Sequence, residues 1–117
     1  MKFVVACMEV AVGLMVAGST MAVDMPELAK KNNCIACHAI DKNGIGPAWM
    51  EVSKKYKGVA QYTYKGKEYA LGEGLMLTVS KGGKGNWGSM PMPANDATDI
   101  KQPDIKKLVE FVLSLAK

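Results

Sequence analysis

The sequence predicts a small all-α domain that follows an N-terminal targeting segment. Four stretches of the chain have apolar residues at helical spacing, and glycine-rich connections separate them. The last stretch, residues 103–116, carries a continuous apolar stripe of isoleucine, leucine and valine. The chain has 117 residues and no internal repeat, so we expect one domain.

Residues 1–22 predict a cleaved signal peptide. Lys2 supplies a basic start, an apolar stretch follows as far as Val16, and the small residues up to Ala22 suit a signal-peptidase site. An acidic residue breaks the apolar stretch, which favours cleavage over a retained anchor because spanning a bilayer requires about 20 apolar residues. We therefore expect residues 23–117 to form one exported domain.

Four helices are expected in this domain. The first covers residues 25–33 and leads directly into a cysteine motif. The second covers residues 48–56 and follows a loop rich in glycine and proline. The third covers residues 73–81. The fourth covers residues 103–116, and Pro103 is typical of a helix start.

Two other segments do not show helical spacing. Alternation within residues 61–65 favours a short strand or hairpin, although an ordered loop is an equal alternative. Residues 86–95 contain two prolines and two methionines, from which we expect neither regular helix nor strand.

The charge distribution argues against nucleic-acid binding. The net charge is +4, and all 15 cationic residues are lysines. Arginine, which makes the bidentate contacts to bases and phosphates, does not occur in the chain. A basic surface suits a protein that meets acidic partners, and an ordinary solvated lysine surface is the alternative.

The pentapeptide Cys34-Ile35-Ala36-Cys37-His38 carries the chemistry. Cys-x-x-Cys-His is the attachment signature of c-type haem. Two thiols at this spacing bond to the two vinyl groups of one porphyrin, and the adjacent histidine presents Nε2 to the iron. The pattern predicts one covalently attached haem with Cys34 and Cys37 as attachment residues and His38 as an iron ligand.

Three other uses of the motif are less consistent with the sequence. A structural zinc site needs four ligands, and the exported domain has only two cysteines and one histidine. A thioredoxin-like dithiol belongs at a helix start after a strand, whereas this motif follows a helix. A plain structural disulfide, which is possible in an exported protein, is the third alternative.

The identity of the second axial ligand follows from what the chain offers. His38 is the only histidine, so a second imidazole from this chain is excluded. Methionine sulfur is a soft donor that favours reduced iron and raises the reduction potential. A methionine between two prolines is held rigidly, which favours Met92. The candidates in the exported domain are Met25, Met50, Met76, Met90 and Met92.

These motifs resemble those of the small bacterial class I cytochromes c of the c-551/c-552 group. Residues 34–41 (CIACHAID) match the haem site of that group, and residues 46–48 (GPA) match the segment after it. Residues 87–95 (WGSMPMPAN) are similar to its Trp-Gly-x-x-Pro-Met-Pro-Pro-Asn stretch. The resemblance implies the class I cytochrome c fold, with N- and C-terminal helices packed around one covalently bound haem.

The resemblance also implies roles for individual residues. Met92 matches the axial methionine, and Pro47 matches the proline whose carbonyl accepts a hydrogen bond from the histidine Nδ1. Trp87 matches a tryptophan that donates to a haem propionate. Asn95 matches an asparagine that forms a hydrogen bond near the methionine sulfur.

The chain departs from the group in three places. The second proline after the methionine is replaced by Ala94. The segment 58–72 is longer than the usual connection, so its tyrosines have no implied role. The group often has an arginine near the propionates, and none exists here; Lys81 or Lys84 is a possible substitute.

Together these features predict a periplasmic, monomeric electron carrier rather than an enzyme. An apolar cleft would surround the haem, and lysines would steer a redox partner that has an acidic patch. The expected cleft residues are Ile45, Pro47, Leu75, Val79, Leu108 and Val112, and the expected lysines are Lys42, Lys54 and Lys55.

Two rival functions remain open. The first is a fixed haem relay in a larger oxidase or reductase. The second is a haem enzyme or gas sensor with an open sixth coordination site, which would require that Met92 not bind the iron. No second histidine is present to act as a distal acid or base.

Overall fold

The computed structural model describes residues 23–117. The predicted signal peptide and its cleavage site lie outside the described residues. Within residues 23–117, no helix has both the length and the apolar character needed to cross a membrane.

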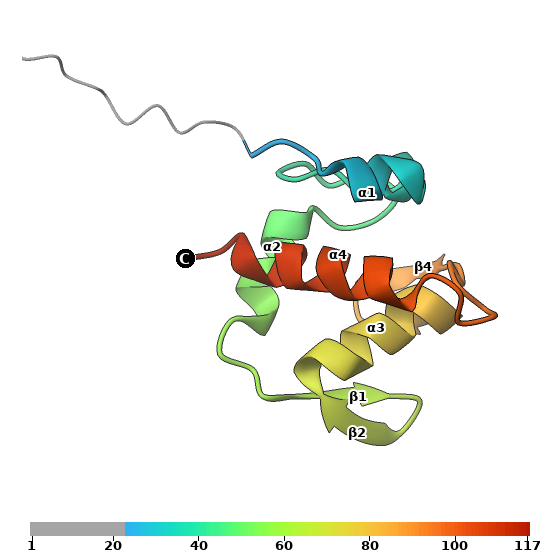
Figure 1. Ribbon diagram of the computed structural model, residues 1–117. Coiled ribbons are helices and arrows are strands. Elements are labelled where there is room, and N and C mark those ends of the chain that lie inside the picture. Colours follow the sequence, from blue (N-terminus) through green and yellow to red (C-terminus); the bar gives the residue numbers. More distant parts are fainter. Residues whose placement is uncertain (1–22) are drawn as a thin grey trace, which may run out of the picture.

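All four expected helices occur, together with a short 3₁₀ turn. They pack around a central region that the last helix crosses (Figure 1). Their bounds are α1 (Glu27–Lys31), η1 (Cys34–Ala36), α2 (Trp49–Tyr56), α3 (Leu71–Lys81) and α4 (Gln102–Ser114).

Helix α1 is shorter than the expected range of 25–33. Pro26 lies before its first turn in an extended conformation, and Asn33 has a φ of 60°. A left-handed residue cannot continue a right-handed helix, so the chain turns at Asn33. The turn carries the cysteine motif out of the helix axis and into η1.

Of the two alternatives expected for residues 61–65, a hairpin or an ordered loop, the structure has the hairpin. Strands β1 (Gln61–Tyr64) and β2 (Lys67–Ala70) pair in antiparallel register, with Tyr62 opposite Tyr69. Lys65 and Gly66 join them with φ values of 48° and 80°. Two positive φ values in a two-residue loop are typical of a type I′ turn, whose twist matches that of the strands.

The expectation that residues 86–95 contain no strand is wrong. Strands β3 (Gly83–Gly85) and β4 (Gly88–Met92) form a two-stranded ribbon. The ribbon pairs at only two positions, with a register shift between them, and within residues 23–117 no further strand pairs with β4. Proline is tolerated in such an edge strand because its missing N–H need not enter a ladder.

Two apolar clusters hold the helices together. In the first, Ala29 of α1 and Trp49 of α2 pack with Leu108 and Val112 of α4. This cluster joins the N- and C-terminal helices. The second joins α2, the hairpin, α3 and α4 through Tyr56, Tyr62, Leu75, Ile105 and Val109.

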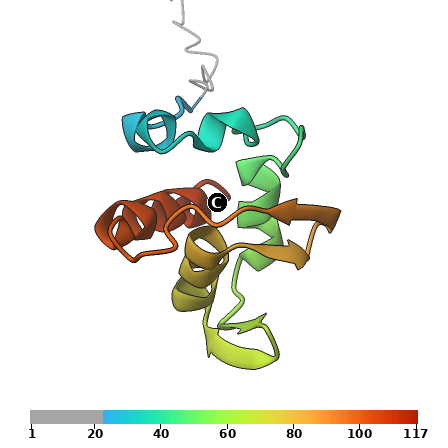
Figure 2. The ribbon, with the colours of Figure 1, turned by 90° about the vertical axis from the view of Figure 1, so that its right-hand side faces the viewer.

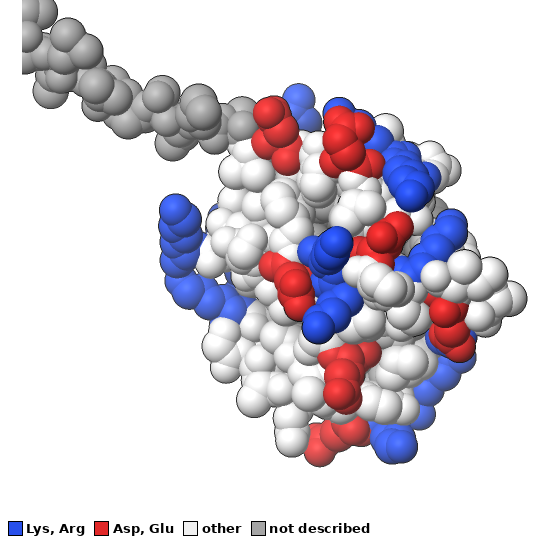
Figure 3. Space-filling model, viewed as in Figure 1, with Lys and Arg blue, Asp and Glu red and all other residues white. Residues whose placement is uncertain are grey.

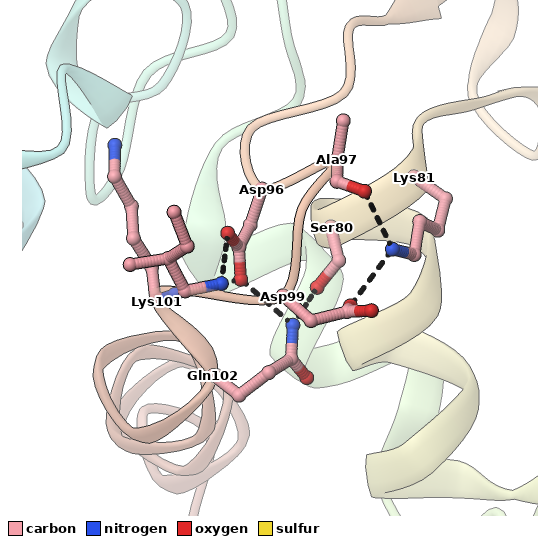
Figure 4. A network of polar contacts seen from close by, with 8 residues as sticks. Ser80, Lys81, Asp96, Ala97, Asp99, Lys101 and Gln102 are labelled. Carbon is pink, nitrogen blue, oxygen red and sulfur yellow. Dashed lines mark hydrogen bonds and ion pairs between the residues drawn. The ribbon is translucent and has the colours of Figure 1, made fainter.

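A buried carboxylate fixes the start of α4 (Figure 4). Asp96 accepts hydrogen bonds from the backbone N–H groups of Ile100 and Lys101, each at 2.8 Å, and from Gln102 Nε2 at 2.9 Å. Gln102 Nε2 also lies 2.8 Å from Ser80 Oγ at the end of α3. Burial alone would raise the pKa of Asp96, but the hydrogen bonds from Gln102, Lys101 and Ile100 outweigh it and lower that pKa.

Candidate functional site

A large cavity lies between the helices and the β3–β4 ribbon. Its volume is about 460 Å³, within the range of roughly 300–1,000 Å³ that is typical of small-molecule and cofactor sites. The wall is mostly apolar, and all six residues expected in the cleft line it: Ile45, Pro47, Leu75, Val79, Leu108 and Val112.

The cysteine motif forms one side of this cavity. Cys34, Cys37 and His38 all line it, and both cysteines are free and half-buried. The tight turn of η1 brings them together: the N–H groups of Cys37 and His38 donate to Cys34 O at 3.2 and 3.0 Å. Burial raises the pKa of the Cys34 thiol above its ordinary value.

The His38 ring is fixed from two directions. Its Nδ1 lies 2.8 Å from Pro47 O, so Nδ1 carries the proton in that hydrogen bond and Nε2 keeps a free lone pair. Gly46 packs against the ring, since a Cβ at this position would lie 2.6 Å from His38 Cε1. The indole of Trp49 also lies near the imidazole of His38, with a distance of 5.9 Å between the two ring centroids.

Two of the five candidate methionines lie at the cavity. Met90 and Met92, both in β4, line it. Met25 and Met76 pack against the two apolar clusters instead, and Met50 is not part of the cavity wall. Met90 is 61% exposed, whereas Met92 is partly buried.

Close packing against α3 holds the Met92 segment. Gly82 has a φ of +85°, and a Cβ there would lie 2.8 Å from Met92 O. Asn95 follows the segment, and its backbone N–H and its Nδ2 both donate to Val79 O at 3.1 Å. Asn95 Nδ2 donates to Pro93 O as well, and Asn95 does not line the cavity.

Trp87 lines the cavity at the turn between β3 and β4. Lys55 Nζ lies 4.5 Å from the centroid of its indole ring and donates a hydrogen bond of 2.8 Å to Asn86 O. A cation over an indole face is attracted to it, so Lys55 links α2 to this turn.

The expected lysines have unequal surroundings. Lys42, Lys54 and Lys55 do not line the cavity. Lys81 pairs with Asp99 at 2.7 Å, whereas Lys84 is the one lysine of residues 23–117 on the cavity wall. On the face shown in Figure 3, lysines alternate with acidic residues and form no single-sign patch.

Six polar residues of the wall were not identified from the sequence as part of it: Asn43, Glu51, Tyr56, Tyr62, Thr78 and Asn86. Tyr56 lies at the apolar spacing of α2, and Tyr62 alternates in β1, but nothing in either pattern indicates which cavity the ring lines. Burial, with the nearby Tyr62 hydroxyl, raises the pKa of Tyr56 to about 12, so its phenol keeps its proton.

The donor set favours haem over zinc. Among residues 23–117, no group of three or more histidine, cysteine, aspartate or glutamate side chains is arranged to hold a metal ion. The cavity instead combines two free thiols, one oriented imidazole and an apolar wall, which is what a covalently held porphyrin requires.

Comparisons with known proteins give the same result. The model of the family described as "Cytochrome c" matches residues 23–116. Cytochrome c-552 of Hydrogenobacter thermophilus is 38% identical over 99 residues, which cover 85% of this chain and 87% of that protein. Cytochrome c-551 of Pseudomonas aeruginosa is 36% identical over 104 residues, covering 89% and 88%.

A solved structure shares the architecture. The crystal structure of Nitrosomonas europaea cytochrome c552 superposes with a TM-score of 0.63 at 34% identity, covering 76% of this chain and 96% of that one. The expected class I fold, the resemblance to the c-551/c-552 group and the single covalently attached c-type haem are thereby confirmed. The chain belongs to the cytochrome c family.

Proposed function

We propose that this protein is a periplasmic electron carrier whose one haem is attached through Cys34 and Cys37 and ligated by His38 and Met92. The observation that carries the proposal is that these four residues line one cavity with an otherwise largely apolar wall. When bound, the haem iron supplies a reversible one-electron change between its ferrous and ferric states.

The protein's own residues prepare the two axial positions. Pro47 O accepts a hydrogen bond from His38 Nδ1, which fixes the ring so that Nε2 would be the atom to bind the iron, with increased donor strength. The close approach of Gly82 to Met92 O limits how far the methionine segment can move. An iron with both positions filled does not bind a substrate, which supports electron transfer over catalysis.

Met92 is favoured over Met90 by its burial. Met90 is 61% exposed, and a thioether exposed to water competes poorly for a site that must exclude it. The two prolines that flank Met92 also restrict its backbone. The alternative function, as a haem enzyme or gas sensor, would require the sixth coordination site to be open.

Location and partners form part of the same proposal. Residues 1–22 would direct export to the periplasm. A monomer with an exposed haem edge would meet acidic redox partners through nearby lysines, of which Lys42 and Lys54 are exposed, Lys54 in a weak surface ion pair with Glu51. Lys55 is engaged with Asn86 and Trp87. If charge reversal at Lys42 and Lys54 left the transfer rate unchanged and independent of salt, docking through these lysines would be excluded.

A visible spectrum of the oxidised, haem-loaded protein tests the axial ligand. Ferric iron bound by methionine gives a weak charge-transfer band in the far red. We expect this band to disappear in Met92→Ala and to persist in the matched variant Met90→Ala. The reverse pattern would assign the ligand to Met90, and a band absent from the unmodified protein would favour the open-site function.

The native molecular mass distinguishes the fixed-relay alternative. A mobile carrier purified from its own periplasm elutes as a single chain of the exported domain. Co-elution of most of the protein with a larger oxidase or reductase, stable in high salt, would instead support a relay subunit.

A further inference from the structure

The cavity wall contains one connected group of neutral hydrogen-bond donors, formed by Tyr62, Thr78 and Asn86. The hydroxyl groups of Tyr62 and Thr78 lie 2.9 Å apart, and Asn86 Nδ2 donates to the Tyr62 hydroxyl oxygen. Thr78 Oγ1 also lies 3.2 Å from Gly74 O. When Thr78 donates its single proton to the Tyr62 oxygen, as Asn86 does, the Tyr62 hydroxyl proton is left for a group inside the cavity. All three residues line the cavity.

Tyr62 has a tightly shaped position in this wall. It is 6% exposed, and its ring packs against that of Tyr56 with a centroid separation of 5.6 Å. Its other side lies on Gly74, where a Cβ would come within 2.5 Å of Tyr62 Cδ1. Helix α3 therefore accommodates this ring only because residue 74 has no side chain.

The position of the group relative to the cysteines selects one edge of the haem. The cysteine turn η1 and the β1–β2 hairpin that carries Tyr62 lie at opposite ends of the molecule in both views (Figures 1 and 2). The vinyl and propionate groups of haem lie on opposite edges of the ring. Attachment at Cys34 and Cys37, on which this inference rests, therefore directs the propionates towards the hairpin.

A propionate that enters this part of the cavity needs hydrogen-bond donors. Burial of an unpaired carboxylate is costly, and hydrogen bonds to its charged form offset that cost. The chain has no arginine, and Lys81 is engaged with Asp99 and Ala97 O. Lys84 is left as the one cation on the described cavity wall.

We propose that the Tyr62 hydroxyl, positioned by Thr78 and Asn86, binds a haem propionate. The β1–β2 hairpin is then part of the cofactor site: it supplies a donor on the side of the cavity where no arginine is available.

The variant Tyr62→Phe tests the assignment, with Tyr64→Phe as its matched control. Both tyrosines lie in β1, and Tyr64 also loses a hydrogen bond, the one of 2.7 Å to Gly82 O, but Tyr64 does not line the cavity. The readout is the reduction potential as a function of pH. The potential falls where the propionate loses its proton, because a carboxylate favours ferric iron.

Loss of a donor to the carboxylate makes it a weaker acid. In Tyr62→Phe we expect the pH of this fall to rise by about one unit, a tenfold change in proton affinity, and in Tyr64→Phe we expect no change. An unchanged profile in Tyr62→Phe overturns the proposal, as does an equal shift in both variants, which would reflect general damage to the hairpin.

A second measurement does not depend on a variant that folds. In the diamagnetic ferrous protein, nuclear Overhauser contacts between the Tyr62 ring or hydroxyl proton and the propionate methylene protons are expected, and their absence overturns the proposal. A pyridine haemochrome spectrum reports attachment at the cysteines independently. Failure of the Tyr62 assignment can therefore be distinguished from failure of the proposed haem attachment.

Discussion

The His38 side of the cavity is held by local contacts, whereas the Met92 side is held by distant ones. His38 and Pro47 are nine residues apart, and the same short loop supplies Gly46. On the other side, Asn95 reaches back 16 residues to Val79, and Lys55 reaches forward 31 residues to Asn86. A local loop can keep its geometry when packing elsewhere loosens, but a segment held by distant contacts cannot. We therefore expect the Met92 side to open first.

The largest effect is expected from Gly46→Ala, which breaks the local side. A Cβ 2.6 Å from His38 Cε1 must displace the imidazole, and with it the hydrogen bond to Pro47 O. We expect the free energy of unfolding of the haem-loaded protein to fall by about 3 kcal/mol, in the upper range for overpacking. Thermal unfolding and the yield of attached haem measure this.

Gly44→Ala is the matched control in the same loop. Its Cβ would meet only Cys37 O, at an ordinary distance of 3.8 Å. Its expected cost is below about 0.5 kcal/mol. Equal losses in both variants would mean that the loop backbone, and not the contact with the imidazole, determines the stability of this side.

A smaller and more selective effect is expected from Gly82→Ala on the Met92 side. The substitution strains a residue with a φ of +85° and moves a Cβ to 2.8 Å from Met92 O. We expect a loss of about 2 kcal/mol. The far-red methionine band should disappear at a lower temperature than the helical circular dichroism signal.

Gly85→Ala is the control that distinguishes the backbone strain of Gly82→Ala from its contact with Met92 O. Gly85 has a φ of +95°, and a Cβ added there would meet no atom within 4 Å, so only the backbone cost of about 1 kcal/mol applies. If Gly85→Ala uncoupled the methionine band from global unfolding as strongly as Gly82→Ala, the close approach to Met92 would not be what holds this side.

The same difference explains what could be predicted from the sequence. Cys34, Cys37, His38 and Pro47 lie within one short motif, and their placement on one cavity wall follows from local geometry. The four helices also follow from local apolar spacing. Such features depend on residues close together in the chain, which a pattern records directly.

Features that depend on distant contacts were missed or predicted wrongly. The β3–β4 ribbon forms because Gly82 and Asn95 bring the Met92 segment against α3, and no local pattern in residues 86–95 indicates a partner. The cavity role of Tyr62 depends on Gly74, which lies in another element. The contact of Lys55 with Trp87 was also missed, because it joins α2 to a turn 31 residues further along the chain.

A pH-dependent effect is expected at the end of the Met92 segment, where Asp96 holds the start of α4. Its pKa is lower in the folded protein than its ordinary value of 3.8, so the carboxylate stabilises the fold above that pH. The contribution is lost as the pH falls below 3.8 and through the lower folded-state pKa. Asp96→Asn should therefore cost most stability between about pH 5 and 7, a range well above the ordinary pKa of an aspartate.

Denaturant unfolding of both proteins between about pH 3 and 7 checks this, because the difference in free energy should shrink at the acid end. Asp99→Asn is the control: Asp99 is exposed and pairs only with Lys81 among the described residues. A constant difference across this pH range would show that Asp96 acts by shape and not by charge.

The smallest effect is expected from Lys55→Met, which releases the turn between β3 and β4. The substitution keeps an unbranched side chain but removes the hydrogen bond to Asn86 O and the cation over Trp87. The expected loss is about 1 kcal/mol, with faster hydrogen exchange in residues 86–88. Lys54→Met removes only an exposed ion pair of 3.6 Å with Glu51, which contributes little. If the two variants were indistinguishable in exchange, Lys55 would not hold the Met92 side. If only Lys54→Met slowed electron transfer to an acidic partner, Lys54 would contribute to docking and Lys55 to the structure of the turn.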